Sequence, residues 1–114
     1  GFVWALWGVY DYAQWTASPE ASRLWTACVG TLRRRLHEFD TGWWSLYEAP
    51  HGGRTMLASR YYHTLHITQL QVMHRLTGMG LFAGTAARFQ AYLDRAPNRA
   101  RAFAQKAVFK LCHY

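Results

Sequence analysis

Two short segments of the sequence hold the side chains that are able to do chemistry. One is Asp-Thr-Gly-Trp-Trp-Ser-Leu-Tyr-Glu at residues 40–48, and the other covers residues 60–70. In the second segment Tyr62 and His66 are four residues apart, and His63 and His66 are three apart, so each pair shares one face of a helix. The N-terminal end of a helix offers free N–H groups and partial positive charge. The pattern therefore indicates a place where an anionic ligand is favoured.

Other kinds of site fit these residues less well. A helical zinc site needs two histidines four residues apart with a further ligand, but His63 and His66 are three apart and both cysteines are distant in sequence. A serine or cysteine nucleophile would need a strained-turn motif, which the sequence lacks. We therefore expect no metal and no cofactor. One alternative stays open, in which Tyr62, His63 and His66 have no functional role and are polar residues that cap the end of a helix.

The adjacent tryptophans Trp43 and Trp44 also leave two interpretations open. Most of the six tryptophans are expected to lie in the core. Because these two follow turn residues, they are either core residues or a platform on which a sugar or a base stacks.

The elements that hold these segments follow from the spacing of apolar residues and from turn residues. The spacing predicts five helices, at residues 2–17, 19–37, 61–77, 81–95 and about 99–111. We expect Ser18 to cap the second helix and Gly78 to end the third. The second helix is expected to bury Leu24, Cys28, Leu32, Leu36 and Phe39, and the last to bury Phe103, Ala107 and Leu111.

The segment between the second and third helices is expected to be extended. Turns are predicted at Asp40-Thr41-Gly42 and at residues 50–53, and residues 43–47 are able to pair with residues 55–59. The fold class is therefore mainly α, built of antiparallel helical hairpins with one short extended or β-hairpin excursion.

Length and composition narrow the class of protein. One domain is expected for 114 residues, and 51% hydrophobic and 17% aromatic residues exclude intrinsic disorder. The longest apolar run, residues 2–7, is too short to span a membrane. The sequence begins at Gly1 with no basic leader, so we expect a fragment of a longer protein. Its first helix is apolar on several faces, so we expect self-association, most simply as a dimer.

The charge of the chain favours a polyanionic partner. The sequence has 13 basic and 6 acidic residues, a net charge of +7. From Thr85 onward Asp94 is the single acid against six basic residues. A polysaccharide, a nucleic acid or a membrane surface would each match this charge, and the alternative is a basic helix face that is only solvated.

Three motifs occur in an order and at a spacing that point to one family. They are the run Gly-Phe-Val-Trp-Ala-Leu-Trp-Gly-Val-Tyr-Asp at residues 1–11, Phe39-Asp40-Thr41-Gly42 with Tyr47-Glu48, and Tyr-His-Thr-Leu-His-Ile-Thr-Gln-Leu-Gln at residues 62–71. Together they resemble the C-terminal helical domain of the D-glucuronyl 5-epimerase family. The resemblance covers roughly residues 1–93 and leaves the basic C-terminal helix, residues 97–114, outside it.

The resemblance implies a fold, a reaction and a set of site residues. The fold would be an incomplete (α/α) toroid, and the enzyme would convert D-glucuronate to L-iduronate in heparosan-type polysaccharides. Epimerisation at carbon 5 needs a base, an acid across the sugar ring, and neutralisation of the carboxylate. Tyr47 and Tyr62 match the family's proton-transfer tyrosines and are the expected catalytic residues. The expected substrate-binding residues, which lie near them in sequence, are Arg60, His63, His66, Trp43 and Trp44.

The sequence also departs from the family pattern. The family's catalytic glutamate, a further tyrosine and an asparagine precede the residues that match Gly1-Phe2, as does a β-rich domain that helps to form the cleft. These 114 residues alone are therefore expected to be inactive. Leu65 stands where animal members of the family have a second threonine, and Trp43 and Trp44 stand where they have smaller residues. The sulfation pattern of the substrate is therefore not implied by the resemblance.

The expected partner is an acidic, uronate-containing polysaccharide. A nucleic acid is not expected, because the sequence has no nucleic-acid motif. The alternative function is a non-catalytic module that binds an anionic polysaccharide through the arginine-rich tail, Trp43 and Trp44.

Overall fold

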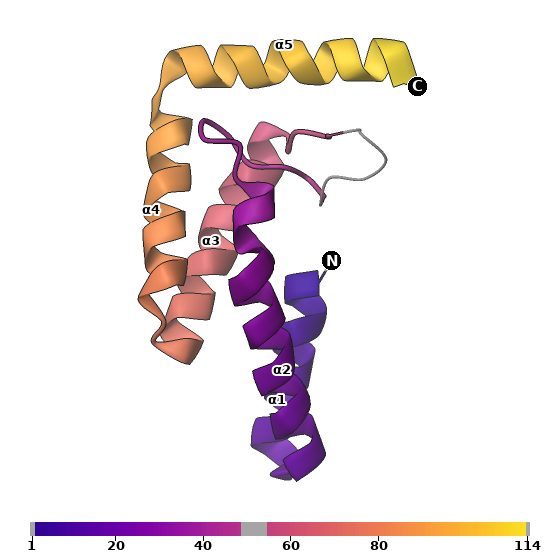
Figure 1. The fold of residues 1–114 in the computed structure, drawn as a ribbon, viewed down its shortest axis with the longest axis vertical. Coiled ribbons are helices and arrows are strands. Elements are labelled where there is room, and N and C mark those ends of the chain that lie inside the picture. The colour runs from indigo at the N-terminus through magenta and orange to yellow at the C-terminus, as the bar shows by residue number, and fades with distance from the viewer. Residues whose placement is uncertain (1, 49–54, 114) are drawn as a thin grey trace. The chain divides into compact units, whose positions relative to one another are not determined.

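The computed structural model describes residues 2–48 and 55–113, and this part of the chain is mainly helical (Figure 1). The elements in chain order are α1 (Phe2–Thr16), α2 (Pro19–Arg35), the 3-10 helix η1 (Leu36–Phe39), α3 (Arg60–Thr77), α4 (Gly80–Asp94) and α5 (Ala96–His113). The expectation of a mainly helical chain is confirmed for this part of the sequence. No helix in it is long and apolar enough to cross a membrane.

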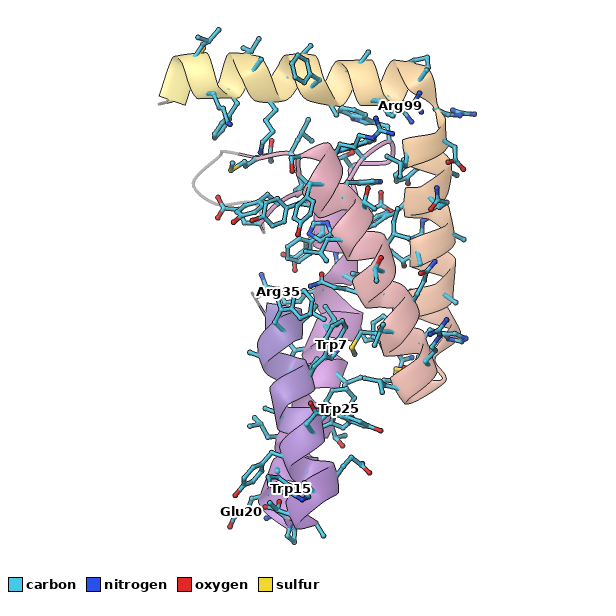
Figure 2. The ribbon with its side chains drawn as sticks, turned by 180° about the vertical axis from the view of Figure 1, so that it is seen from behind. Trp7, Trp15, Glu20, Trp25, Arg35 and Arg99 are labelled. Atoms are coloured by element: carbon cyan, nitrogen blue, oxygen red, sulfur yellow. The ribbon has the colours of Figure 1, made fainter. Side chains whose placement is uncertain are left out.

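Contacts divide the chain into two compact units, the α1–α2 unit (residues 1–36) and the α3–α5 unit (residues 37–114). In the α1–α2 unit the side chain of Ser18 accepts a hydrogen bond from the Ala21 N–H at 3.3 Å, which confirms the predicted cap. Leu32 of α2 is buried, but Leu24 is half exposed, so the predicted stripe is wrong at its first position. Trp15 lies exposed at the end of α1 where the chain turns into α2 (Figure 2).

The α3–α5 unit is built on α3 and α4, which run side by side in opposite directions (Figure 1). Gly78 ends α3 with a φ of 70°, and its N–H bonds to the His74 carbonyl at 2.7 Å, so the predicted helix end is confirmed. The pair buries apolar side chains from both helices, namely Ile67, Leu70, Met73, Phe82, Ala86 and Phe89.

The expected β-hairpin is wrong for the described residues, which contain no strand there. Two isolated bridges join Asp40 to Ser45 and Leu46 to Leu57. Trp44, Ser45 and Leu46 are buried one after another. The Leu46–Leu57 bridge lies within the predicted pairing of residues 43–47 with residues 55–59, but it remains isolated, so this segment is an ordered loop and forms no strand. The turn predicted at residues 50–53 lies outside the described residues.

Helix α5 turns away from α4 and runs across this ordered loop (Figure 1). It begins at Ala96, earlier than predicted, because Pro97 is compatible with the first turn of a helix. Ala102 is buried against Trp44, Leu46 and Leu57.

The face predicted for α5 is wrong, because Phe103 and Leu111 are 79% and 86% exposed. The small side chain of Ala102 allows the helix backbone to approach the loop. Arg99, labelled in Figure 2, secures the start of α5 through a 2.8 Å hydrogen bond from Nη1 to the Leu93 carbonyl.

Candidate functional site

The loop that begins the site is fixed by the predicted Asp-Thr-Gly turn. Oδ1 of Asp40 accepts a hydrogen bond from the Gly42 N–H at 2.9 Å. Oγ1 of Thr41 accepts one from the Trp44 N–H at 2.9 Å and donates one to the Trp44 carbonyl at 2.8 Å. Gly42 has a φ of 90°, which favours glycine. The turn is therefore confirmed, and it sets the direction in which Trp44 and Ser45 leave it.

Asp40 also ties this turn to α4. Its Oδ1 accepts a hydrogen bond from the Tyr92 hydroxyl at 2.9 Å, and its Oδ2 accepts one from Nε of Arg88 at 3.3 Å. Burial and the Asp40 carboxylate both raise the pKa of Tyr92, so its phenol keeps its proton and remains a donor. These contacts give Asp40 an anchoring role.

Trp44 is a core residue in this structure. Its side chain is fully buried, Nε1 donates to the Ala58 carbonyl at 2.9 Å, and its ring stacks on His63 with centroids 3.9 Å apart. The surface-platform interpretation therefore does not apply to Trp44. Trp43 is partly buried, and the guanidinium of Arg101 lies 4.1 Å from its ring centroid, a cation–π contact that joins α5 to the loop.

Ser45 joins His63 and His66 of α3. Its Oγ lies 2.7 Å from Nδ1 of His63 and 3.0 Å from Nδ1 of His66. Nε2 of His63 lies 2.8 Å from the Phe89 carbonyl on α4. Ser45 and His63 are fully buried and His66 is partly buried. Four groups from the loop, α3 and α4 thus form one continuous hydrogen-bond network.

Burial keeps both histidines neutral. It lowers the pKa of His63, although the hydrogen bond to Phe89 and the charge of Asp40 act in the opposite direction. Burial and the proximity of His63 lower the pKa of His66 to about 4. At neutral pH these two side chains therefore supply no positive charge, and what they offer a ligand is hydrogen bonding.

The two predicted catalytic tyrosines lie together. The ring centroids of Tyr47 and Tyr62 are 4.9 Å apart in an edge-to-face contact. Ser59 caps α3 and accepts a hydrogen bond from the Tyr62 N–H at 3.2 Å, while the Tyr47 N–H bonds to the Met56 carbonyl at 2.8 Å. Their side chains are 42% and 39% exposed, so both are accessible to a ligand.

A lysine that sequence analysis did not assign to the site stands beside this pair. Nζ of Lys106 on α5 lies 5.8 Å from the ring centroid of Tyr47 and donates a 3.0 Å hydrogen bond to the Leu57 carbonyl. Lys106 also lines a groove of about 410 Å³ between residues 55–57 and α5, whose lining does not include Tyr47 or Tyr62. The sequence showed that the last helix is basic, but no sequence motif connects Lys106 with Tyr47, which lies 59 positions earlier.

Arg60 is not brought to the tyrosine pair. It lines a shallow hollow of α3 together with Tyr61, Thr64, Leu65 and Thr68. Arg60 and Tyr62 are two residues apart on a helix with 3.6 residues per turn, so they leave α3 on nearly opposite sides. Ser45 was the other residue that sequence reasoning missed, and its one signal was a small hydroxyl inside an aromatic run.

The described residues contain no cluster of three or more His, Cys, Asp or Glu side chains that could hold a metal ion. Cys28 and Cys112, one in each unit, are free thiols.

A comparison with known protein families supplies a name for the matching family. A family model described as "D-glucuronyl C5-epimerase C-terminus" matches residues 1–91. The matched segment includes Tyr47, Tyr62 and the Ser45–His63–His66 network, and it ends before α5 begins.

Proposed function

The chain belongs to the D-glucuronyl C5-epimerase C-terminal family, and from this premise we propose that it forms the helical part of the catalytic site of a uronate 5-epimerase. The proposed reaction converts D-glucuronate to L-iduronate within an acidic polysaccharide, by removal and return of the proton on carbon 5. In this proposal the helical pairs are part of an incomplete (α/α) toroid.

The observation that carries the proposal is the edge contact of Tyr47 and Tyr62 at 4.9 Å, with both rings open to solvent. One residue comes from the loop and the other from the first turn of α3, and because their rings are in contact both hydroxyls are within reach of one sugar. We assign proton transfer at carbon 5 to this pair. A positioned acid or base contributes about 10²–10⁴-fold to the rate of such a step.

The carboxylate of the substrate must be neutralised while carbon 5 loses its proton. The buried histidines are neutral, so we assign this task to Lys106, which stands beside Tyr47. Its ammonium has three N–H groups and uses one on the Leu57 carbonyl, which leaves two for a ligand. Arg60 remains a proposed contact for a more distant part of the polysaccharide.

A second function is favoured by the charge of α5. No acidic residue occurs from Arg95 to the end of the chain, while Arg95, Arg101 and Lys110 are exposed. The same chain could therefore hold a polyanionic saccharide without acting on it. This alternative makes binding independent of the hydroxyls of Tyr47 and Tyr62, and the substitutions below separate the two functions.

The test uses three matched Tyr→Phe substitutions in the natural protein that carries this chain. Tyr47→Phe and Tyr62→Phe each remove one hydroxyl from the proposed pair, whereas Tyr61→Phe removes one from a neighbour that is 71% exposed. Deuterium uptake at carbon 5 of glucuronate is expected to fall by about 10²–10⁴-fold in the first two variants and to stay unchanged in the third. Equal uptake in all three variants would remove the tyrosine pair from the mechanism.

The 114-residue chain is tested in parallel by titration with a heparosan oligosaccharide, monitored by NMR. Shifts at Tyr47 and Tyr62 would support the site even if this segment has no activity by itself. Shifts restricted to α5 would favour the binding-module function.

A further inference from the structure

In the hydrogen-bond network between α4 and His66, the donor and the acceptor of each hydrogen bond can be assigned in only one way. The Phe89 carbonyl has no proton, so Nε2 of His63 must be the donor across their 2.8 Å contact. Because His63 is neutral, its Nδ1 has no proton and accepts from the hydroxyl of Ser45 at 2.7 Å. That hydroxyl has then used its single proton, so the 3.0 Å contact to His66 must be donated by Nδ1–H of His66.

The tautomer of His66 follows from this direction. A neutral imidazole with its proton on Nδ1 carries a lone pair on Nε2, which is then a hydrogen-bond acceptor. Among the described residues, Nε2 of His66 has no hydrogen-bond partner, and no buried side-chain nitrogen or oxygen is left without one. Nε2 therefore reaches solvent as an unoccupied acceptor.

We propose that Ser45 and His63 are positioning residues that hold His66 as the Nδ1–H tautomer, so that its Nε2 accepts a hydrogen bond from a ring hydroxyl of the substrate sugar. This proposal rests on the proposed function, and it names the part of the substrate that His66 binds. A neutral acceptor repels a carboxylate and attracts an O–H donor, so His66 selects a hydroxyl.

The position of His66 gives the sugar a direction. His66 lies one helical turn after Tyr62 on the same face of α3, while Lys106 stands on the Tyr47 side of the tyrosine pair. The tyrosine pair therefore has two kinds of neighbour, a cation with free N–H groups beside Tyr47 and a lone pair one helical turn after Tyr62. A uronate would place its carboxylate toward Lys106 and a hydroxyl toward His66.

The first experiment measures the tautomers directly in the unmodified chain. Long-range ¹H–¹⁵N correlation spectra of histidine-labelled protein at neutral pH distinguish a protonated from an unprotonated ring nitrogen. We expect His63 with its proton on Nε2 and His66 with its proton on Nδ1. The donor order from His66 through Ser45 to His63 and on to the Phe89 carbonyl is called the relay below. A protonated Nε2 in His66, or two protonated nitrogens in either ring, would overturn this relay.

A pair of hydroxyl deletions then tests whether Ser45 causes this state. Ser45→Ala removes the hydroxyl that joins the two rings, and His66 is expected to become a mixture of tautomers. Thr64→Ala removes an exposed hydroxyl of α3 that donates to the Arg60 carbonyl, and it is expected to leave both tautomers unchanged. If Ser45→Ala fails to fold, the spectra of the unmodified chain still decide the relay.

The ligand is tested with two anionic probes. Methyl β-D-glucuronide carries a carboxylate and ring hydroxyls, whereas cyclohexanecarboxylate carries a carboxylate and a ring without hydroxyls. Only the glucuronide is expected to shift the Nε2 resonance of His66, and Ser45→Ala is expected to weaken its binding about 3- to 10-fold, the equivalent of one hydrogen bond. An equal shift with both probes, or no shift with the glucuronide, would overturn the assignment of a hydroxyl to His66.

Failure here is distinguishable from failure of the proposed function. If carbon-5 exchange depends on Tyr47 and Tyr62 but the His66 tautomer is wrong, only the relay is lost. If the tautomers are as expected but exchange does not depend on the tyrosines, the relay holds its rings in place and the proposed catalytic role is lost.

Discussion

Acid should destabilise the α3–α5 unit well above the pH at which carboxylates titrate, because of His63 and His66. Both histidines have a lowered pKa in the folded chain, and for His66 the value is about 4 against 6.5 for an ordinary histidine. Between these two values the unfolded chain binds more protons than the folded chain, so stability falls as the pH falls. The stabilisation is complete above pH 6.5 and is lost progressively toward pH 4.

The size of the effect follows from the shift. One pKa unit corresponds to about 1.4 kcal/mol, so the change from 6.5 to about 4 for His66 gives roughly 3 kcal/mol over the whole window. Within the window each buried histidine contributes a slope of up to about 1.4 kcal/mol per pH unit. His63 acts in the same direction as His66.

Urea unfolding between about pH 7 and pH 5 measures this slope. NMR signals of Ile67 in α3 and Phe89 in α4 make the readout specific to the α3–α5 unit. His66→Gln keeps a side-chain N–H for Ser45 but cannot titrate, so it is expected to reduce the slope. His37→Gln, at an exposed histidine, is the control and should leave the slope unchanged. A flat profile in the unmodified chain, or the same slope in His66→Gln, would refute the inference that buried neutral imidazoles hold this unit together.

Three further outcomes are expected. Gly42→Ala should lower the free energy of unfolding by about 1–3 kcal/mol because φ is 90°, whereas Gly84→Ala, in the interior of α4 with open space at its Cβ, should raise it by about 0.5–1 kcal/mol; thermal unfolding measures both. Lys106→Gln should weaken binding of a heparosan oligosaccharide more than Lys110→Gln does, and added salt should weaken binding to the unmodified chain; equal losses in the two variants would place the carboxylate elsewhere. Trp15→Gln, at an exposed position of α1, should reduce the self-association that we propose for the chain, as measured by sedimentation.

The parts of the fold that were predictable from sequence depend on neighbours in the chain. The Ser18 cap, the Gly78 helix end and the Asp40-Thr41-Gly42 turn each rest on contacts between residues two to four apart, so residue type and position were sufficient. The family was also recognisable, because its tyrosine and histidine motifs are short and contiguous.

The errors arose where packing between distant segments decided the outcome. Periodicity found the apolar residues of α5, but the loop below it accepts Ala102 and leaves Phe103 in water. The bonds from Ser45 to the histidines join residues 18 and 21 positions apart, and nothing local marks them. For Trp44 the sequence left a core and a platform interpretation open, and its stacking on His63 in the structure puts it in the core.

Burial changes the electrostatic argument for the site. From sequence, His63 and His66 were expected to bind the substrate, with no indication of their charge. Because desolvation makes them neutral, the same residues can act only as hydrogen-bonding groups at neutral pH. The charge must then come from elsewhere, and the cation found beside Tyr47 is Lys106 of α5. Since α5 lies beyond the segment that matches the family, the proposed carboxylate contact is a feature of this chain that the family assignment does not supply.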